Sequence, residues 1–539
     1  MINNSFLQKF YIKFPVVKIF NLNNGKFYIY DAKSAFLTEV SSRQLRLIYQ
    51  IQDNTGNRRF PKYLIKLFEN NVFRPGAIEK LTPSPAETKK IVADEVENQI
   101  PRKFTLEISE KCTLRCRYCL YTNDDFHKRK HSQKSMKKEI AFKAIDWYFS
   151  RYTSAISKIP EHRRVDVYKT LPPVLIWWGG EPFTEFELLK ETKHYIESLN
   201  WGLYGIKKDD IHYNIVTNLT ILNDEIIDFL VTNEINLQVS LDGDQKEHDK
   251  NRVFPNGEGS FQKVFNNINE LISRHPKYVK NHLTINTVLA DNIDHDNAST
   301  FINEYFDVGK YNRKISLWNP TFERHEGEII PRGFFIHDTN AQIAEFRKNF
   351  IMLKSKGIDY INEFLFNNKA LYNQLLELYL LEQKIEFDYP NSKIYLPKTF
   401  SCPLGSDTLF VSTNGDLHCC NQVDYSFPLG NVYQGLITEK MESVYNSYFK
   451  KIDTQCKKCW AVIFCKICPA LVCLNSEFKL PSMRECESMR NIIETNILAY
   501  IILSTEFESL HPTITSFFDR MTKDTRHISM PTKIKDFMY

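Results

Sequence analysis

The chain has 539 residues, of which 42% are hydrophobic and 25% charged, values that are ordinary for a soluble globular protein of roughly two to four domains. Its 70 basic and 65 acidic residues nearly balance, which argues against nucleic acid as a partner. The longest apolar runs, such as 497–503, are too short to span a bilayer, and the N-terminus lacks the apolar core of a secretory signal. We therefore expect a cytoplasmic protein that does not bind a membrane.

Residues 1–100 are predicted to form a small N-terminal α+β domain. Two strand-like segments, 14–22 and 26–30, flank an Asn-Asn-Gly turn. Helical patterns follow at 41–52 and 61–70. The polar, proline-containing stretch 81–98 is predicted to be a linker to the next domain.

Residues 101–325 alternate between strand and helix patterns. Strands are predicted at 104–109, 174–178, 212–218, 237–241, 284–289 and 315–318. Helices are predicted between them, at 138–149, 185–199, 224–232 and 262–273. Strands joined by crossover helices imply a parallel sheet. Because the unusual residues gather at the carboxyl ends of these strands, we expect a barrel-like α/β fold with its site at that edge.

Three cysteines follow the first of these strands, Cys112, Cys116 and Cys119, with three and then two residues between them. An iron–sulfur cluster needs several thiolates that converge on one small inorganic core, and a loop after a strand can supply them. Three ligands for a cubane of four irons leave one iron without a protein ligand, where chemistry can occur. A structural zinc site is the alternative, but zinc usually takes four ligands in paired spacings.

This spacing, with the aromatic Tyr118 just before the third cysteine, resembles the motif of the radical S-adenosylmethionine (SAM) superfamily. The resemblance implies a [4Fe-4S] cluster on the three cysteines, SAM on its open iron, a six-stranded partial (β/α)6 barrel, and Tyr118 as a cofactor contact. After the second strand comes Gly179-Gly180-Glu181, where the superfamily holds the amino group of the methionine part of SAM. Two glycines permit a close approach of the backbone, and a carboxylate can accept hydrogen bonds from an ammonium group.

The stretch after the fourth strand is similar to the matching region of sulfatase-maturing and peptide-maturing radical enzymes. Polar groups there help to hold the ribose and carboxylate of the cofactor, which implies Ser240 and Arg252 as cofactor contacts. The alternatives are a simple turn at Asp242 and a helix cap at 248–249. Asn286 on the fifth strand is either a further cofactor contact or a buried polar residue of the core.

Residues 326–400 are predicted to form a helical bridge, residues 401–490 a cysteine-rich domain, and residues 491–539 a C-terminal helical tail. In a large chain without an export signal, clustered cysteines indicate metal or cluster ligands rather than disulfides. The cysteine-rich domain contains Cys402, Cys419, Cys420, Cys456, Cys459, Cys465, Cys468, Cys473 and Cys486.

The order of these cysteines resembles the SPASM domain of enzymes that mature peptides, sulfatases and quinone cofactors. One separation is a residue shorter than in the family, which leaves the assignment of Cys468 against Cys473 open. By analogy, one auxiliary [4Fe-4S] cluster is held by Cys402, Cys420 and Cys468, with Cys419 or Cys473 as its fourth ligand. The second is held by Cys456, Cys459, Cys465 and Cys486. A pair of zinc sites is the alternative, because paired spacings are also typical of zinc.

The resemblance implies a reaction in which a 5′-deoxyadenosyl radical abstracts hydrogen from the substrate and the auxiliary clusters take the remaining electron. The first hypothesis is a peptide maturase that forms a thioether or carbon–carbon crosslink in a ribosomally made precursor peptide. Its leader would bind the N-terminal domain, which is often winged-helix-like in such enzymes. The alternative is that residues 1–100 form an N-terminal cap on the barrel. The second hypothesis is an anaerobic sulfatase-maturating enzyme, which oxidises Cys or Ser to formylglycine. A non-catalytic zinc-binding module is the third.

Both enzymatic hypotheses require two further components. An external electron donor such as flavodoxin or ferredoxin must reduce the first cluster. A base must take a proton for a net oxidation, and the sequence offers Asp242, Asp249 and Asp407 near the expected site without choosing among them.

Overall fold

The structure is a computed structural model. It describes residues 4–22, 26–50, 67, 72–73, 75–78, 81–97, 99–119, 121, 130–159, 164, 172–201, 207–288, 290, 292–306, 316–318, 322–325, 328–331, 339–356, 375, 379, 386–387, 404–405, 408–465, 468–469, 473–474, 477–478, 480–481 and 483–516.

The central feature is a sheet in which six neighbouring parallel strands follow chain order, β4-β5-β6-β7-β8-β9. These strands are β4 (Lys103–Ser109), β5 (Val174–Gly179), β6 (His212–Thr217), β7 (Asn236–Ser240), β8 (Leu283–Val288) and β9 (Ser316–Trp318). Each neighbouring pair is parallel, so all their carboxyl ends lie at one edge. The predicted parallel α/β sheet is therefore confirmed.

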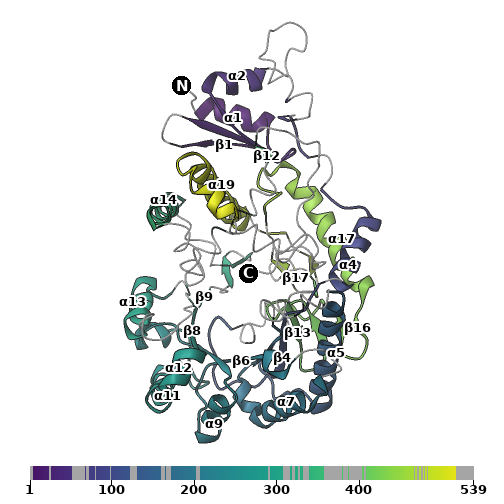
Figure 1. Cartoon of the computed structure of the whole chain (residues 1–539), viewed down its shortest axis with the longest axis vertical. Helices are drawn as coiled ribbons and strands as arrows, with labels where there is room; N and C mark the ends of the chain where they lie inside the picture. Colours follow the sequence, from purple (N-terminus) through teal and green to yellow (C-terminus); the bar gives the residue numbers. More distant parts are fainter. Residues whose placement is uncertain are drawn as a thin grey trace.

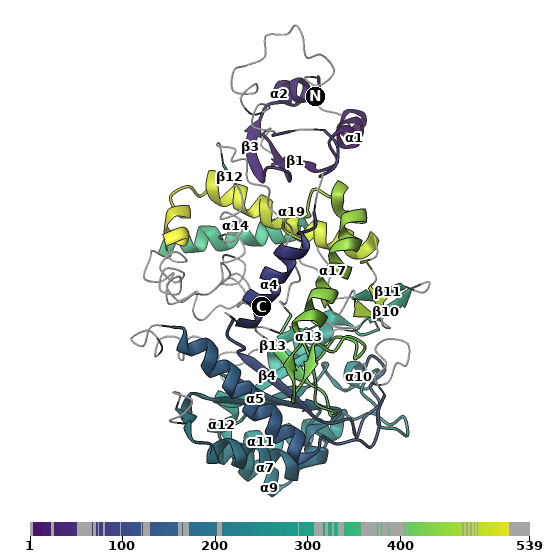
Figure 2. The same cartoon turned by 90° about the vertical axis from the view of Figure 1, so that its right-hand side faces the viewer.

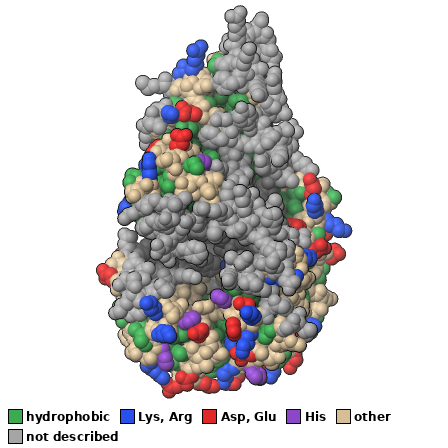
Figure 3. All heavy atoms as spheres, viewed as in Figure 1, with side chains coloured by type: hydrophobic (Ala, Val, Ile, Leu, Met, Phe, Trp, Pro, Cys, Tyr) green, Lys and Arg blue, Asp and Glu red, His purple; other side chains and the backbone are tan. Residues whose placement is uncertain are grey.

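Helices cover the outer face of this sheet and form an arc around the strands in Figure 1. They are α5 (Lys138–Ser157), α7 (Phe186–Ser198), α9 (Asp224–Thr232), α11 (Phe261–Arg274), α12 (Pro276–His282) and α13 (His295–Tyr305). Because side chains alternate along a strand, Phe104, Leu106 and Ile108 of β4 enter the apolar core, and Glu107 lies on the opposite face. On the surface of this layer, acidic and basic side chains are interspersed (Figure 3).

The sheet continues beyond β4 into the cysteine-rich region, which the sequence analysis did not predict. Strand β13 (Thr408–Val411) pairs in parallel with β4, although about three hundred residues separate them in the chain. Strands β14 (Asp416–His418), β15 (Gly430–Asn431) and β16 (Gly435–Leu436) follow in antiparallel order. The cysteine-rich region is thus anchored on the parallel sheet by backbone hydrogen bonds.

The N-terminal part forms a second, separate sheet of order β1-β2-β3-β12. Its elements are α1 (Asn4–Lys13), β1 (Val17–Asn21), β2 (Phe27–Asp31), β3 (Phe36–Val40), α2 (Ser42–Gln50) and the distant β12 (Glu386–Phe387). The two predicted strands are present as β1 and β2 and the helix predicted at 41–52 is present as α2, whereas α1 and β3 were not predicted. The helix predicted at 61–70 lies outside the described residues except for Leu67.

Residues predicted to be a linker instead form helix α4 (Pro85–Glu97). Its start is a capping box, in which Ser84 Oγ accepts from Glu87 N (3.2 Å) and Glu87 Oε2 accepts from Ser84 N (2.6 Å). Helix α4 packs on α17 (Thr438–Gln455), where Tyr445 donates to Glu95 Oε1 (2.5 Å) (Figure 2). The Ser-x-x-Glu spacing was a helix signal that the high polarity of the stretch concealed.

A second large core joins parts of the chain that are remote in sequence. It contains buried side chains of the N-terminal sheet, of α14 (Thr339–Lys356), of the turn 461–464 and of α19 (Met483–Thr505). Figure 1 places α19 between the N-terminal sheet and the rest of the molecule. Two short hairpins are also described: β10 (Phe322–His325) with β11 (Glu328–Pro331), and β17 (Cys473–Leu474) with β18 (Glu477–Phe478). Among the described helices, none combines the length and apolarity that crossing a bilayer requires.

Candidate functional site

The three-cysteine loop leaves the carboxyl end of β4 and is held by the segment that follows β7. Arg115 N donates to Val253 O (2.7 Å), and Arg117 N donates to Asn251 O (3.0 Å). Cys116 is buried, while Cys112 and Cys119 are half-buried and within the electrostatic range of one another. In the described part of the chain, no three His, Cys, Asp or Glu side chains are close enough to hold a single metal ion.

The cysteine sulfurs have N–H donors around them. Cys112 Sγ accepts from Leu114 N (3.5 Å) and from Asn218 Nδ2 (3.6 Å), and Cys116 Sγ lies 4.0 Å from Arg252 Nη1. Burial raises the pKa of the Cys112 thiol above its ordinary value, and raises that of Cys116 to about 12. A free thiol here keeps its proton, whereas a cluster would replace the proton and use the same donors to stabilise its thiolates. The donor set therefore fits an iron–sulfur cluster.

The glycines after β5 lie directly against this loop. A Cβ atom on Gly179 would be 2.1 Å from Ser109 O, and one on Gly180 would be 2.3 Å from Lys111 O and 3.0 Å from Cys112 Cβ. Their backbones are joined to the loop, because Gly180 N donates to Ser109 O (2.8 Å) and Glu181 N donates to Lys111 O (2.7 Å). Both glycines are thus required for the close contact between the end of β5 and the cysteine loop.

Glu181 is fully buried, and its carboxylate is engaged by the protein itself. Oε1 accepts from Phe183 N (3.1 Å) and from Thr217 Oγ1 (2.7 Å), and Oε2 accepts from Asn218 N (2.8 Å). Burial raises its pKa to about 7, and the three hydrogen bonds oppose that shift. In this structure Glu181 ties the end of β5 to the end of β6, and its role toward a cofactor ammonium group stays a prediction.

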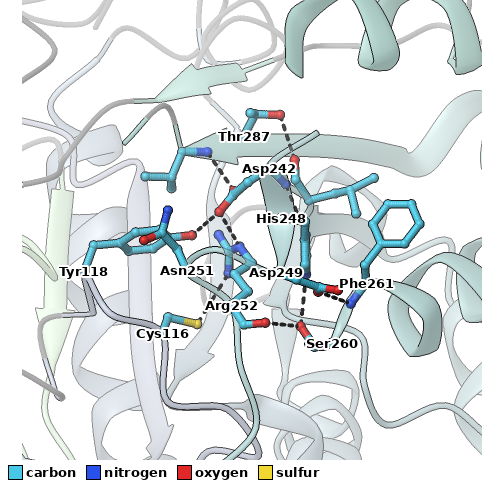
Figure 4. A network of polar contacts seen from close by, with 12 residues as sticks. Cys116, Tyr118, Asp242, His248, Asp249, Asn251, Arg252, Ser260, Phe261 and Thr287 are labelled. Atoms are coloured by element: carbon cyan, nitrogen blue, oxygen red, sulfur yellow. Dashed lines mark hydrogen bonds and ion pairs between the residues drawn. The ribbon is translucent and has the colours of Figure 1, made fainter. Parts of the chain in front are cut away.

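A buried polar network links the cysteine loop to the ends of β7 and β8 (Figure 4). Asp242 Oδ2 accepts from Arg252 Nε (2.9 Å) and from the Tyr118 hydroxyl, and Oδ1 accepts from Val288 N (2.9 Å). The guanidinium of Arg252 also lies over the Tyr118 ring, 5.3 Å from its centroid. Asp242 is therefore the centre of an ion-pair network, and it does more than form the simple turn that was the alternative.

The same network continues toward helix α11. His248 Nδ1 accepts from Asp242 N (3.3 Å), and His248 Nε2 shares a hydrogen bond with Ser260 Oγ (2.9 Å), which in turn donates to Arg252 O (2.8 Å). Asp249 Oδ1 accepts from Phe261 N (2.8 Å) at the start of α11, so the helix-cap alternative holds for Asp249. In Figure 4, Ser260 lies between His248 and the backbone oxygen of Arg252, and Asp249 points toward Phe261.

These contacts bear on the base candidates. Both carboxylate oxygens of Asp242 are occupied by buried partners, and Asp249 serves as a cap. Asp407 lies outside the described residues.

Ser240 and Asn286 are paired in register across β7 and β8, at the same edge of the sheet as the cysteine loop. Both are buried, as a cofactor contact or a core residue would be.

The structure also reveals site residues that the sequence analysis missed. Glu107 accepts from the Tyr121 hydroxyl at one oxygen and from Thr413 N (3.0 Å) at the other, which joins the β13–β14 turn to the cysteine loop. The ring of Trp178 lies 5.8 Å from Tyr121 and 5.6 Å from Phe410. A buried acid in an apolar strand was the available signal for Glu107, but its partner Thr413 is too distant in the chain to be inferred.

The cysteine-rich region brings one of the predicted sets together. Cys456 and Cys465 each interact electrostatically with Cys459 and Cys486, so the four side chains lie near one another. Burial, together with these neighbours, raises the pKa of the Cys456 thiol to about 12. Cys456 ends helix α17, and Cys486 lies on α19. These four are the predicted second set, and their role as cluster ligands stays a prediction.

The predicted first set is only partly visible. Cys419 is buried and Cys420 and Cys468 are half-buried beside the apolar core of α17. Cys402 lies outside the described residues, and of Cys473 only the backbone is described, in β17. The choice between Cys419 and Cys473 as fourth ligand therefore remains open.

The chain is similar to known proteins over the region that holds this site. Residues 106–298 match the model of the Radical SAM superfamily. The serine-type anaerobic sulfatase-maturating enzyme of Bacteroides thetaiotaomicron is 30% identical over 165 residues, which are 30% of this chain and 34% of that protein. The cysteine-type enzyme of Clostridium novyi is 26% identical over 178 residues, 33% of this chain and 41% of that protein. The chain thus spans about a third to two fifths of the length of these curated relatives.

Two solved structures are similar at lower identity. Native anSMEcpe with bound AdoMet is 20% identical with a TM-score of 0.47, and the match covers 75% of this chain and 99% of that one. Streptococcus suis SuiB bound to S-adenosylmethionine is 12% identical with a TM-score of 0.40, and the match covers 87% and 98%. The family match extends from β4 to α13 and so includes the loop, the glycines and the Asp242 network. The part of this chain that holds the candidate site is therefore a radical SAM domain, which implies SAM and a [4Fe-4S] cluster as its cofactors.

Proposed function

We propose that this protein is a radical SAM enzyme that oxidises a peptide or protein substrate, with auxiliary iron–sulfur clusters on its C-terminal cysteines. The observation that carries the proposal is the cysteine loop itself, which lies at the carboxyl edge of a parallel sheet inside a radical SAM domain and has N–H donors beside Cys112 and Cys116. The gathering of Cys456, Cys459, Cys465 and Cys486 supports a second cluster site.

Bound SAM would supply a strongly oxidising carbon radical. The chain's own residues hold the surroundings in place. Gly179 and Gly180 keep the end of β5 against the loop, and Arg252 places a positive charge beside Cys116. Tyr118, Ser240 and Asn286 lie close to this edge and are proposed to contact the cofactor. The buried Asp242 network fixes the loop without taking part in proton transfer.

The first candidate reaction is crosslinking of a precursor peptide. The N-terminal sheet supports it, because it is a unit additional to the radical SAM domain, with β1 at one edge of the described sheet. A sheet edge is a common docking place for an extended peptide, and on this edge Ile19 N already donates to the Tyr11 hydroxyl (3.3 Å). A flavodoxin or ferredoxin is the proposed electron donor.

The second candidate is formylglycine formation, and a specific observation favours it. Both curated relatives are named anaerobic sulfatase-maturating enzymes, one serine-type and one cysteine-type. Each matches over only about a third of this chain, so the likeness covers the radical SAM domain and leaves the substrate undecided.

Metal analysis tests the proposal. After anaerobic reconstitution, we expect about twelve irons per chain, falling to about eight when Cys112, Cys116 and Cys119 are all replaced by Ala. Cys112→Ala should abolish cleavage of SAM, whereas Cys456→Ala should retain some cleavage and lose the product. About four irons with two zincs would remove the auxiliary redox role, and iron-free protein would leave only the zinc-module hypothesis.

Product analysis separates the two reactions. The full chain is incubated with candidate precursor peptides, with and without their leaders, and with a sulfatase-derived peptide that contains Cys or Ser. A crosslink removes two hydrogens and requires the leader, while formylglycine is an aldehyde that a hydrazine reagent labels. Aldehyde formation on the sulfatase peptide, with no change in any precursor, would exclude the first candidate.

A further inference from the structure

The N-terminal sheet packs directly on the turn that carries Cys459 and Cys465. The Phe20 ring lies 6.2 Å from the Trp460 ring, and the Lys18 ammonium lies 5.2 Å from the same indole. The backbone is joined as well, since Ile78 N donates to Lys457 O (2.9 Å). The second cysteine set is therefore covered by the N-terminal domain.

Tyr30 of β2 is the polar side chain of this contact that matters most. It is fully buried, and its ring lies 5.6 Å from that of Phe464, the residue before Cys465. Within the described residues, its hydroxyl has no hydrogen-bond partner. A buried hydroxyl without a partner is costly, so a structure that retains one usually has a further group to supply the missing bond.

The electrostatic surroundings indicate which group this is. The pKa of Tyr30 is raised chiefly by burial, then by the negative charges of Asp31 and Cys459. The hydroxyl therefore keeps its proton and lies within the field of the Cys459 sulfur. Tyr28, two residues earlier on the same strand, differs because its hydroxyl donates to Glu39 Oε2 (3.1 Å).

We propose that the Tyr30 hydroxyl donates a hydrogen bond to the Cys459 thiolate when the second cysteine set binds its cluster, so that the N-terminal domain completes that site. This rests on the proposed auxiliary cluster. Hydrogen bonds to cysteine sulfur withdraw charge and favour the reduced cluster, which raises its reduction potential. Tyr30 is thus a positioning and tuning residue, supplied by the N-terminal domain.

The test compares Tyr30→Phe with Tyr28→Phe, the same change on the same face of the same strand. Both are made in the background that lacks Cys112, Cys116 and Cys119, so that only auxiliary clusters remain. We expect unchanged iron content in both variants and a lower reduction potential for one cluster in Tyr30→Phe alone, measured by a redox titration followed by electron paramagnetic resonance. In D₂O, a deuteron coupled to that cluster should disappear in Tyr30→Phe and persist in Tyr28→Phe.

Two results would overturn the assignment. Equal potentials and couplings in Tyr30→Phe and the parent would show that the hydroxyl does not bond the cluster, and equal shifts in both variants would show a packing effect. A separate experiment tests whether the auxiliary cluster exists. If the four cysteines bind no cluster, the iron content will not fall when Cys456, Cys459, Cys465 and Cys486 are replaced by Ala. If zinc occupies the set, Co²⁺ substitution keeps the test open, because loss of the hydrogen bond should shift the thiolate-to-cobalt absorption band in Tyr30→Phe only.

Discussion

At the scale of single residues, the site is built around a buried ion pair. Asp242 and Arg252 are both almost fully buried, and Tyr118 and Val288 N supply the remaining hydrogen bonds. A buried pair is weak evidence of net stabilisation, but breaking it leaves an uncompensated charge. The pair therefore acts as a constraint on the cysteine loop, because Arg252 also contacts Cys116.

Replacing Arg252 by Met should test this constraint. We expect the free energy of unfolding of the apo protein to fall by about 3–5 kcal/mol, since Asp242 loses its counter-charge. The double change Arg252→Met with Asp242→Asn should recover part of that loss. Urea denaturation of the singles and the double gives the coupling energy.

The control for this cycle is an exposed ion pair on the helix layer. Lys190 pairs with Glu187 and Glu225 at the surface, where solvent screens the charges, so Lys190→Met should cost far less stability than Arg252→Met. A loss for Arg252→Met as small as that of Lys190→Met would show that the buried pair does not hold the loop.

At the scale of elements, Glu181 joins the ends of β5 and β6, and its elevated pKa makes this joint depend on pH. Burial raises the pKa of Glu181 in the folded protein to about 7, above the ordinary value of 4.5, so between these values the folded state keeps a proton that the unfolded chain releases. The contribution of Glu181 to the free energy of unfolding is thus fully present below about pH 4.5 and is lost as the pH rises to 7.

The expected size of this effect is about 3 kcal/mol, from a shift of about 2.5 pH units at 1.36 kcal/mol each. Glu181→Gln carries no titrating proton and serves as the reference. The difference in unfolding free energy between the wild-type apo protein and Glu181→Gln should fall by this amount from pH 5 to pH 8. A constant difference would mean that the carboxyl group titrates near its ordinary pKa.

Helices and strands that depend on local sequence patterns were predictable, whereas contacts between residues far apart in the chain were not. The parallel strands β4–β9 show apolar patterns between helices, so their positions follow from periodicity. The pairing of β13 with β4 joins residues about three hundred positions apart, and no local pattern encodes it. Likewise, the Gly-Gly-Glu segment was recognised, but its engagement by Thr217 and Asn218 depends on the register of β5 against β6.

At the scale of the whole molecule, the protein has two large hydrophobic cores, and each contains residues from parts of the chain that are far apart in sequence. One lies between the parallel sheet and its helices, and it also takes in Leu409 and Val411 of the cysteine-rich region. The other joins the N-terminal sheet to α14, α19 and the turn that bears Cys459 and Cys465. The N-terminal domain is thus part of the architecture of the second cysteine set.

Because of this arrangement, an N-terminal truncation would do more than remove a binding site for the leader peptide. Deleting residues 1–95 would be the obvious test of leader binding, but it also removes the buried side chains Val16, Phe20, Tyr28, Tyr30 and Leu37 from the second core. Each large side chain lost corresponds to about 2 kcal/mol of burial, and the apolar faces of α14 and α19 would meet water. We expect the truncated chain to aggregate, or to lose about four irons while it retains the cluster of the radical SAM domain.

Size-exclusion chromatography and iron analysis of the truncated chain check this expectation, with Ile12→Ser as the control. Ile12 belongs to the same domain but is 83% exposed, so its replacement should leave both solubility and iron content unchanged. A soluble, monomeric truncated chain with full iron content would contradict the prediction and show that the N-terminal domain is detachable. Only in that case would loss of peptide modification by the truncated chain report on leader recognition, because otherwise it follows from the damaged second cysteine set.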